Sequence, residues 1–200
     1  MRTLLLLIAI CPLACRPSSS TPARPAREPI SFPLANFKLT ERSGKTIQKS
    51  DLTGKVWIAS FIFTRCNGPC PQVTGSMKNL QNALAGEKEV RLVTFTVDPA
   101  NDDPAELQNY AQRFNADSER WLFLTGTEKA IHDLLNKSFK VGASRNEGGK
   151  PGDAFTHSSH LAVVDKQGNV RGYFQGIGEP AELDLAMKQL QELVHKLQAE

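Results

Sequence analysis

Residues 55–63 read KVWIASFIF and are followed at once by TRCNGPCP at residues 64–71. The first stretch is a nearly continuous run of β-branched and aromatic residues, which is typical of a strand that other elements cover on both faces. Pro71 is typical of the first turn of a helix, because the N–H that proline lacks would be unpaired there anyway. The sequence therefore predicts a central strand, a short loop that carries Cys66 and Cys70, and a helix.

Strands and helices keep alternating on the C-terminal side of this junction. Apolar residues recur at helical spacing after the cysteines and in three later segments, and short apolar runs of strand length lie between them. The last two of these runs flank a turn at residues 166–169 and predict a hairpin. Beyond 55–63, the predicted strands are residues 90–97, 121–124, 160–164 and 170–174, and the predicted helices run up to Gly86, over 104–114, around 131–139 and from about Pro180.

The N-terminal side adds a small hairpin or edge element, around residues 32–40 and 45–47. The complete order predicts an α/β fold with a mixed central sheet flanked by helices and an N-terminal hairpin extension. With a cysteine pair between the first central strand and its helix, this order is similar to the thioredoxin fold.

Length and composition fit one globular domain with an ordinary core. The chain has 200 residues, of which 40% are hydrophobic, and its 24 basic and 21 acidic residues leave a formal net charge of +3. A charge this small and evenly scattered excludes the electrostatic footprint of a nucleic-acid-binding protein. The longest apolar stretch, residues 4–14, is shorter than the ~20 residues of a spanning helix, so the chain is not a multi-span membrane protein.

The N-terminus predicts export and a membrane tether. A positive start followed by LLLLIAICPLA has the form of a secretory signal. Its end, Ala14-Cys15, resembles a bacterial lipoprotein signal, in which the cysteine becomes the lipid-modified first residue of the mature chain. Pro12 stands where that pattern prefers leucine, so ordinary cleavage and an uncleaved anchor stay as alternatives.

Residues 16–29 contain four prolines and three serines and have little to bury, which predicts an extended tether. We therefore expect a signal peptide at 1–15, a tether at 16–29 and a domain at 30–200. The domain would lie in the periplasm or at the cell surface, held at the membrane through lipid on Cys15.

Cys66 and Cys70 are the only cysteines of the predicted domain. A structural disulfide is one interpretation for an exported protein, but closing a loop of about 5 residues gains only about 2 kcal/mol, against about 4 to 5 for a long loop. Reactivity or metal binding explains the pair better. The positive end of the following helix should favour the thiolate form of Cys70. Two close thiolates select copper(I) or zinc over hard cations, and a structural zinc site would need four protein ligands.

Four histidines are candidates for a third ligand. His132 lies off the apolar stripe of its helix and His195 lies in the last turn of the C-terminal helix, so both are predicted to be solvated. His157 and His160 stand at the entry to a buried strand, where side chains three positions apart point to opposite faces. At most one of these two is expected to face the cysteines, and the periodicity does not say which.

Three separated motifs resemble the Sco/SenC family of copper-binding, thioredoxin-like proteins. They are FTRCNGPCP at residues 63–71, TVDP at 96–99 with DDPAEL behind it, and FTHSSHLAVVDKQG at 155–168. The resemblance covers about residues 30–198. It implies one copper ion per chain, bound by the two cysteines and by the histidine that stands eleven residues before the glycine of the strand turn. It therefore implies Cys66, Cys70 and His157 as ligands and leaves His160 as a bystander.

Asp98 lies in the second motif. Together with Pro99 it would close a turn without any further function, or its carboxylate would lie beside the copper ligands and tune their charge. Many family members have Pro-Asp-Val between the cysteines and Asp before the histidine, where this chain has Asn67-Gly68-Pro69 and Thr156. Neither departure removes a ligand, but both leave copper affinity and redox potential open.

Two functions follow from the resemblance. The chain would be a copper chaperone that delivers copper to the dinuclear centre in the copper-bearing subunit of cytochrome c oxidase. Alternatively, Cys66 and Cys70 would form the redox pair of a membrane-tethered thiol-disulfide oxidoreductase that keeps oxidase cysteines or other exported thiols reduced. A peroxidase is disfavoured, because Phe63 stands where peroxiredoxins carry a threonine. Residues 144–153 are rich in turn formers and predict a mobile loop that lets His157 move onto copper held by the cysteines.

Overall fold

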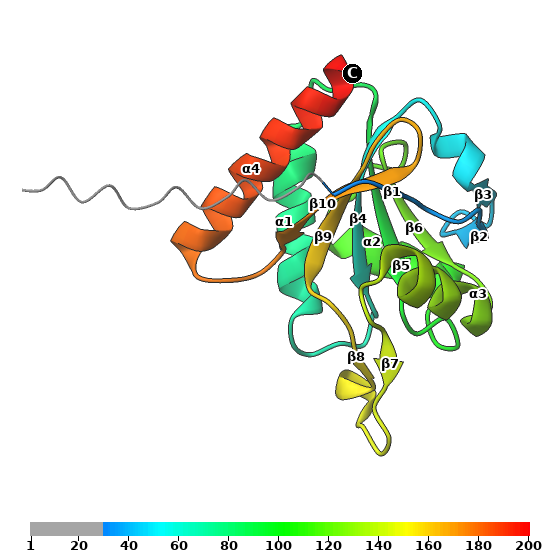
Figure 1. The fold of residues 1–200 in the computed structure, drawn as a ribbon. Helices are drawn as coiled ribbons and strands as arrows, with labels where there is room; N and C mark the ends of the chain where they lie inside the picture. The colour runs from blue at the N-terminus through cyan, green and yellow to red at the C-terminus, as the bar shows by residue number, and fades with distance from the viewer. Residues whose placement is uncertain (1–29) are drawn as a thin grey trace, which may run out of the picture.

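The computed structural model describes residues 30–200, so the predicted signal peptide, the tether and Cys15 lie outside the described residues. An eight-stranded sheet with helices packed on it forms the fold (Figure 1). Its strands are β1 (Phe32–Pro33), β2 (Lys38–Glu41), β3 (Thr46–Gln48), β4 (Val56–Ile62), β5 (Val90–Thr96), β6 (Trp121–Thr125), β9 (His160–Val164) and β10 (Asn169–Gln175). The helices are α1 (Cys70–Ala83), α2 (Pro104–Arg113), α3 (Glu128–Asp133) and α4 (Pro180–Ala199), joined by a π-helical turn (Leu134–Phe139) and two 3₁₀ turns (Lys49–Leu52 and Pro151–Asp153).

Strand β4 is central, as its sequence predicts. The strand order is β1-β10-β9-β4-β5-β6-β2-β3, and every residue of β4 is buried. β4, β5 and β6 run parallel, whereas β9 pairs antiparallel with β4 and β10 pairs antiparallel with β9. The predicted mixed sheet is therefore confirmed, and so is the N-terminal hairpin, because β2 pairs with β3 and extends the sheet beyond β6.

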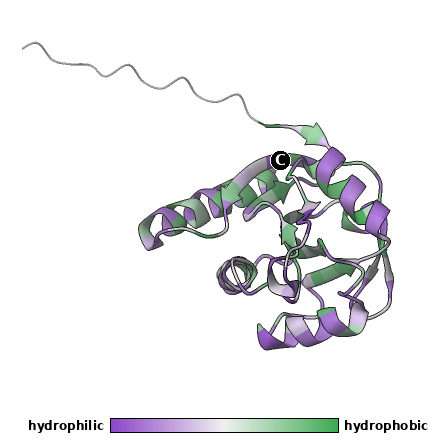
Figure 2. Cartoon of the chain, turned by 90° about the horizontal axis from the view of Figure 1, so that it is seen from below, coloured by the Kyte–Doolittle hydropathy of each residue, from purple (hydrophilic) through white to green (hydrophobic). Residues whose placement is uncertain are grey.

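Helices cover both faces of the sheet. Figure 1 shows α1 and α4 together on one side and α3 on the other, and Figure 2 shows that the hydrophobic residues concentrate on the strands that these helices cover. At the end of the π-helical turn that follows α3, the ring of Phe139 lies 5.1 Å from that of Phe61, 5.3 Å from that of Phe95 and 6.0 Å from that of Trp57. This aromatic cluster anchors the third helical segment to β4 and β5. Within residues 30–200, no helix combines the length and apolarity needed to cross a bilayer.

Two segments differ from the sequence-based expectation. The helix expected around residues 131–139 is α-helical only to Asp133 and then widens into the π-helical turn that ends at Lys140, whose φ is 57°. The wider turn buries Leu134, Leu135 and Phe139 together, which explains why the apolar pattern continues past the α-helix. The expected loop at 144–153 is a turn over residues 146–150, but its first two residues form β7 (Ser144–Arg145), which pairs with β8 (Phe155–Thr156) in a two-stranded ribbon.

The aromatic cluster predicts the effect of truncating its central ring. Phe139 is fully buried, so Phe139→Ala should lower the free energy of unfolding by about 3–5 kcal/mol, as cavity-forming substitutions of buried phenylalanine do. Leu185 is 56% exposed, so Leu185→Ala should change it by less than about 0.5 kcal/mol. Urea unfolding of both variants measures the difference, and similar losses in the two would contradict this assignment of the core.

Candidate metal centre

The central strand and the first helix place the two cysteines. β4 ends at Ile62, and α1 begins at Cys70, with Pro69 as its N-cap and Pro71 in its first turn. The N–H of Cys66 donates to the Phe63 carbonyl over 3.2 Å, which turns the loop back on the strand end. Both thiols are free and buried. The predicted strand, cysteine loop and helix are therefore confirmed.

His157, which lies 87 residues after Cys70 in the sequence, contacts this loop. Its Nε2 atom lies 3.3 Å from Cys70 Sγ. Its ring also lies edge-on to Phe63, with ring centroids 5.9 Å apart. The structure thus brings His157 to Cys70, and Cys66 and His157 line the same hollow.

The hydrogen bonds of His157 orient its free nitrogen. Nδ1 lies 3.1 Å from the carbonyl oxygen of Ser158, and because a carbonyl only accepts, Nδ1 carries the proton. Nε2 then presents its lone pair to Cys70, which is the arrangement of a metal-binding imidazole. Burial lowers the pKa of His157 below its ordinary value, with the Ser158 carbonyl opposing this weakly, so the ring is kept neutral and able to act as a ligand.

The expected thiolate character of Cys70 is wrong. Burial raises the pKa of the Cys70 thiol far above its ordinary value, and the neighbouring Cys66 side chain raises it further. A helix N-terminus contributes at most about 2 kcal/mol toward the thiolate, whereas taking an ion out of water costs several kcal/mol. Cys70 is fully buried, so burial outweighs the helix dipole and the metal-free site holds thiols.

Two sulfurs and one imidazole nitrogen form a soft donor set, which fits copper(I). The set is too small for structural zinc, which takes four protein ligands. In the part of the chain that the structure describes, no three His, Cys, Asp or Glu side chains stand close enough together to hold a metal ion. The donors fit a copper ion by their chemistry, and binding through all three would require them to move closer together.

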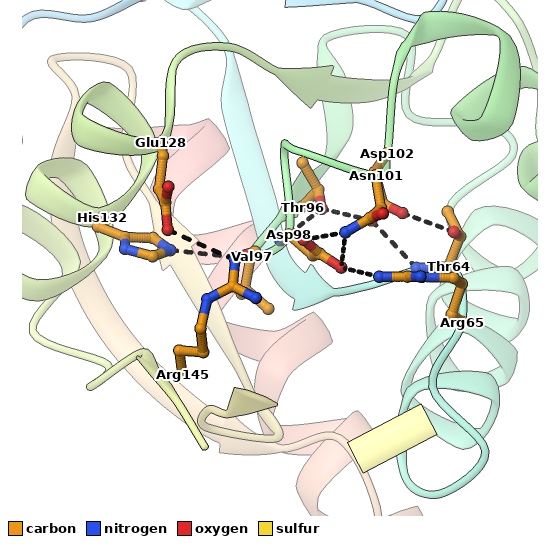
Figure 3. A network of polar contacts seen from close by, with 10 residues as sticks. All are labelled: Thr64, Arg65, Thr96, Val97, Asp98, Asn101, Asp102, Glu128, His132 and Arg145. Atoms are coloured by element: carbon orange, nitrogen blue, oxygen red, sulfur yellow. Dashed lines mark hydrogen bonds and ion pairs between the residues drawn. The ribbon is translucent and has the colours of Figure 1, made fainter. Parts of the chain in front are cut away.

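Asp98 contacts the cysteine loop through Arg65. The fully buried carboxylate of Asp98 lies 2.8 Å from Arg65 Nη2 and accepts from Asn101 Nδ2 at 2.9 and 3.0 Å (Figure 3). Arg65 directly precedes Cys66, and its side chain is 42% exposed. Asp98 therefore does more than end a strand, because it fixes the residue before the first cysteine.

A second buried carboxylate, Asp102, was not singled out by the sequence. It accepts the N–H and the hydroxyl of Thr64 at 3.1 and 2.6 Å and the hydroxyl of Thr96 (Figure 3). Burial raises the pKa of Asp102, while the hydrogen bonds from Thr64 and Thr96 oppose that rise. In the sequence it is one of several acidic residues in a turn-rich stretch, and no spacing marks it. Together, Asp98 and Asp102 tie both residues before Cys66 to the end of β5.

The other three histidines, His132, His160 and His195, contact residues other than the two cysteines. His160 Nδ1 contacts the Ser158 hydroxyl at 3.0 Å. His195 is more than half exposed beside Glu87, as predicted. His132 differs from its prediction, because it is only partly exposed: its Nε2 lies 3.1 Å from the Val97 carbonyl and its ring packs against Phe155.

Comparison with known proteins places these features in a family. The sequence profile described as SCO1/SenC matches residues 30–193. The chain is similar to the SCO1 protein homolog of Bacillus subtilis (strain 168), with 34% identity over 153 residues that span 76% of this chain and 78% of that protein. It is also similar to a solved SCO1/SenC family lipoprotein from Bacillus anthracis str. Ames, with 31% identity, a TM-score of 0.77, and coverage of 87% of this chain and 99% of that chain.

Two further solved structures bear on the site. BsSco, described as a member of the Sco family of cytochrome c oxidase assembly proteins with a disulfide switch, has 30% identity and a TM-score of 0.74, over 86% of this chain and 96% of that chain. Yeast Sco1, solved with copper bound, has 25% identity and a TM-score of 0.67, over 82% of this chain and 88% of that chain. These likenesses confirm the predicted thioredoxin-like fold.

The burial of Cys70 predicts how its reactivity depends on pH. Because its pKa is raised, the thiolate fraction at Cys70 should rise about tenfold per pH unit from pH 7 to 10 without levelling off. An ordinary cysteine, with a pKa of about 8.5, levels off above pH 9. Iodoacetamide labelling of the reduced full chain, with peptide mapping of Cys70, measures this profile, and the urea-unfolded chain is the control. A plateau below pH 8 would mean that the helix dipole dominates.

Proposed function

The chain belongs to the SCO1/SenC family, and on this premise we propose that it is a copper chaperone for cytochrome c oxidase. Its domain takes up one copper ion through Cys66, Cys70 and His157 and passes it to the dinuclear copper centre of the oxidase. The observation that carries this proposal is the 3.3 Å approach of His157 Nε2 to Cys70 Sγ. The copper-bound yeast Sco1 and the oxidase-assembly role described for BsSco's family support it.

The donor set suits a metal that is carried and released. Three soft ligands bind copper(I) well and leave it open to attack by a further thiol or imidazole of an acceptor. A hollow of about 490 Å³ lies directly beside the site and includes Cys66, Asn67, Pro69, Phe155 and His157 in its lining. An acceptor side chain has access to the metal from this hollow, so ligand exchange does not require the domain to unfold.

Removing the imidazole should separate metal binding from thiol chemistry. His157→Ala should weaken copper(I) binding by about 100-fold or more, because even loss of a ligand's outer partner typically costs about 10- to 100-fold. Thiol-disulfide exchange should stay largely intact, since both cysteines remain. Competition titration with a copper(I) chelator measures the affinity, and oxidase assembly in cells measures the consequence.

His160→Ala is the matched control, because it removes a histidine three positions away that contacts Ser158. This variant should keep both copper binding and oxidase assembly. If His157→Ala loses copper but still supports oxidase assembly, the chaperone function is wrong and the thiol-disulfide oxidoreductase, which needs only the two cysteines, takes its place.

We also propose that the chain is exported and held at the membrane by lipid on Cys15. The support is the signal-like sequence at residues 1–15 and the description of the similar Bacillus anthracis protein as a lipoprotein. Cys15→Ala should abolish incorporation of labelled palmitate and move the chain from the membrane to the soluble fraction. Cys11→Ala is the control and should change neither. Membrane retention of the Cys15→Ala chain would instead indicate an uncleaved anchor.

A further inference from the structure

The loop between the two cysteines contains the only asparagine of the chain that a glycine follows, Asn67-Gly68. A backbone nitrogen can attack the side-chain amide carbon of the asparagine that precedes it. Glycine hinders this attack least, because it has no Cβ atom. Asn36 is also exposed and lies outside the helices and strands, but the bulky Phe37 follows it. The sequence therefore singles out Asn67 for this chemistry.

The structure leaves the reacting atoms accessible. Asn67 and Gly68 are both exposed, and a Cβ atom on Gly68 would meet nothing within 4 Å, so the space around the attacking nitrogen is open. Neither the carbonyl of Asn67 nor the N–H of Gly68 takes part in a hydrogen bond between backbone atoms of residues 30–200. The peptide unit that must turn for the attack is therefore not held by the neighbouring backbone.

Other asparagines of the domain are held by their side chains. The amide of Asn101 donates to the Asp98 carboxylate at 2.9 and 3.0 Å. The amide of Asn146 donates to the Asp153 carbonyl at 2.9 Å and accepts from the Thr156 hydroxyl at 2.8 Å. These hydrogen bonds must break before a backbone nitrogen reaches the amide carbon, so these asparagines are protected.

We propose that Asn67 is a site of spontaneous deamidation. The nitrogen of Gly68 bonds to Cγ of Asn67, the bond from Cγ to Nδ2 breaks, and ammonia leaves with the proton of the Gly68 N–H. Water then adds to one of the two carbonyl carbons of the resulting cyclic imide and opens the ring. The product is aspartate or isoaspartate. No electrons are exchanged, and water is the only co-reactant.

The modification changes the hollow beside the cysteines, because Asn67 lines it together with Cys66 and His157. A neutral amide becomes a carboxylate, and isoaspartate also adds one methylene group to the backbone between Cys66 and Cys70. A nearby negative charge disfavours thiolates, so the modified chain should bind copper(I) more weakly. This consequence rests on the proposed function, whereas the deamidation itself does not.

Mass spectrometry of the peptide that contains Asn67 measures deamidation of the reduced full chain in mildly alkaline buffer, and isoaspartyl methyltransferase labelling identifies isoaspartate. Asn67 should lose its amide at least tenfold faster than Asn36 in the same sample. Its rate should be less than tenfold below that of the urea-unfolded chain, because the fold does not protect it. A smaller ratio to Asn36, or a larger protection by the fold, would overturn the site.

Gly68→Ala tests the role of the attacking nitrogen. The substitution fits the fold, because a Cβ there meets nothing within 4 Å and the backbone is not in the left-handed region. It should slow deamidation of Asn67 about tenfold, since the added Cβ hinders the nitrogen. Gly86→Ala, where a Cβ also meets nothing within 4 Å, is the matched control and should leave the rate unchanged. Equal rates in the two variants would contradict attack by Gly68.

Copper(I) competition titration of Asn67→Asp, which carries the charge of the product, supplies the second readout. This variant should bind copper(I) about threefold or more weakly than the neutral control Asn67→Gln, because it adds a negative charge beside the thiolates. Equal affinities would overturn the effect on the copper site. A wild-type chain that binds no copper(I) would overturn the proposed function instead, and the mass measurement would still decide whether Asn67 deamidates.

Discussion

The desolvation of two thiols and one imidazole at the end of β4 is the constraint on which the site depends. Burial raises the pKa of Cys70 and lowers that of His157, so in the metal-free protein Cys70 is a thiol and His157 is a neutral imidazole. Burying uncharged side chains lowers the folding stability little, whereas each buried thiolate without a nearby cation would lower it by several kcal/mol. In the function proposed above, copper(I) would supply the positive charge that stabilises the thiolates as their protons leave. Metal uptake would then be coupled to proton release.

The polar network behind the cysteines increases this coupling. Asp98 and Asp102 are both fully buried, and Arg65, a partly exposed residue, pairs with the first of them. The charge of Asp102 also raises the pKa of Cys70. Asp102, which ties Thr64 in place, thus also disfavours a thiolate at Cys70 in the metal-free protein.

The sequence predicts those parts of the fold that depend on local pattern. The uninterrupted apolar run of β4 and the cysteine-proline junction after it need no long-range information, and both are found as predicted. Long-range contacts are different. Spacing alone does not show whether His157 or His160 faces the cysteines, because that depends on how the β7–β8 ribbon packs. The family resemblance was needed to select His157. The pKa of Cys70 was mispredicted because the helix terminus is visible in the sequence and the depth of burial is not. Asp102 lies in the DDPAEL stretch that carries the resemblance, but nothing in its spacing shows that it contacts the cysteine loop.

A carrier must hold its metal against loss and still surrender it to an acceptor, and the topology offers a physical route to both. Cys66 and Cys70 belong to the junction of β4 and α1, which the core fixes. His157 follows a small ribbon that contacts the domain through a backbone hydrogen bond, an exposed ion pair and the buried ring of Phe155, which lies edge-on to Phe63. The hydrogen bond and the ion pair contribute about 1 kcal/mol each, and one buried ring is less than the seven buried residues that hold β4. Withdrawal of the imidazole would therefore cost less than movement of β4. In the proposed function it would leave copper on two sulfurs beside the hollow from which an acceptor ligand could enter.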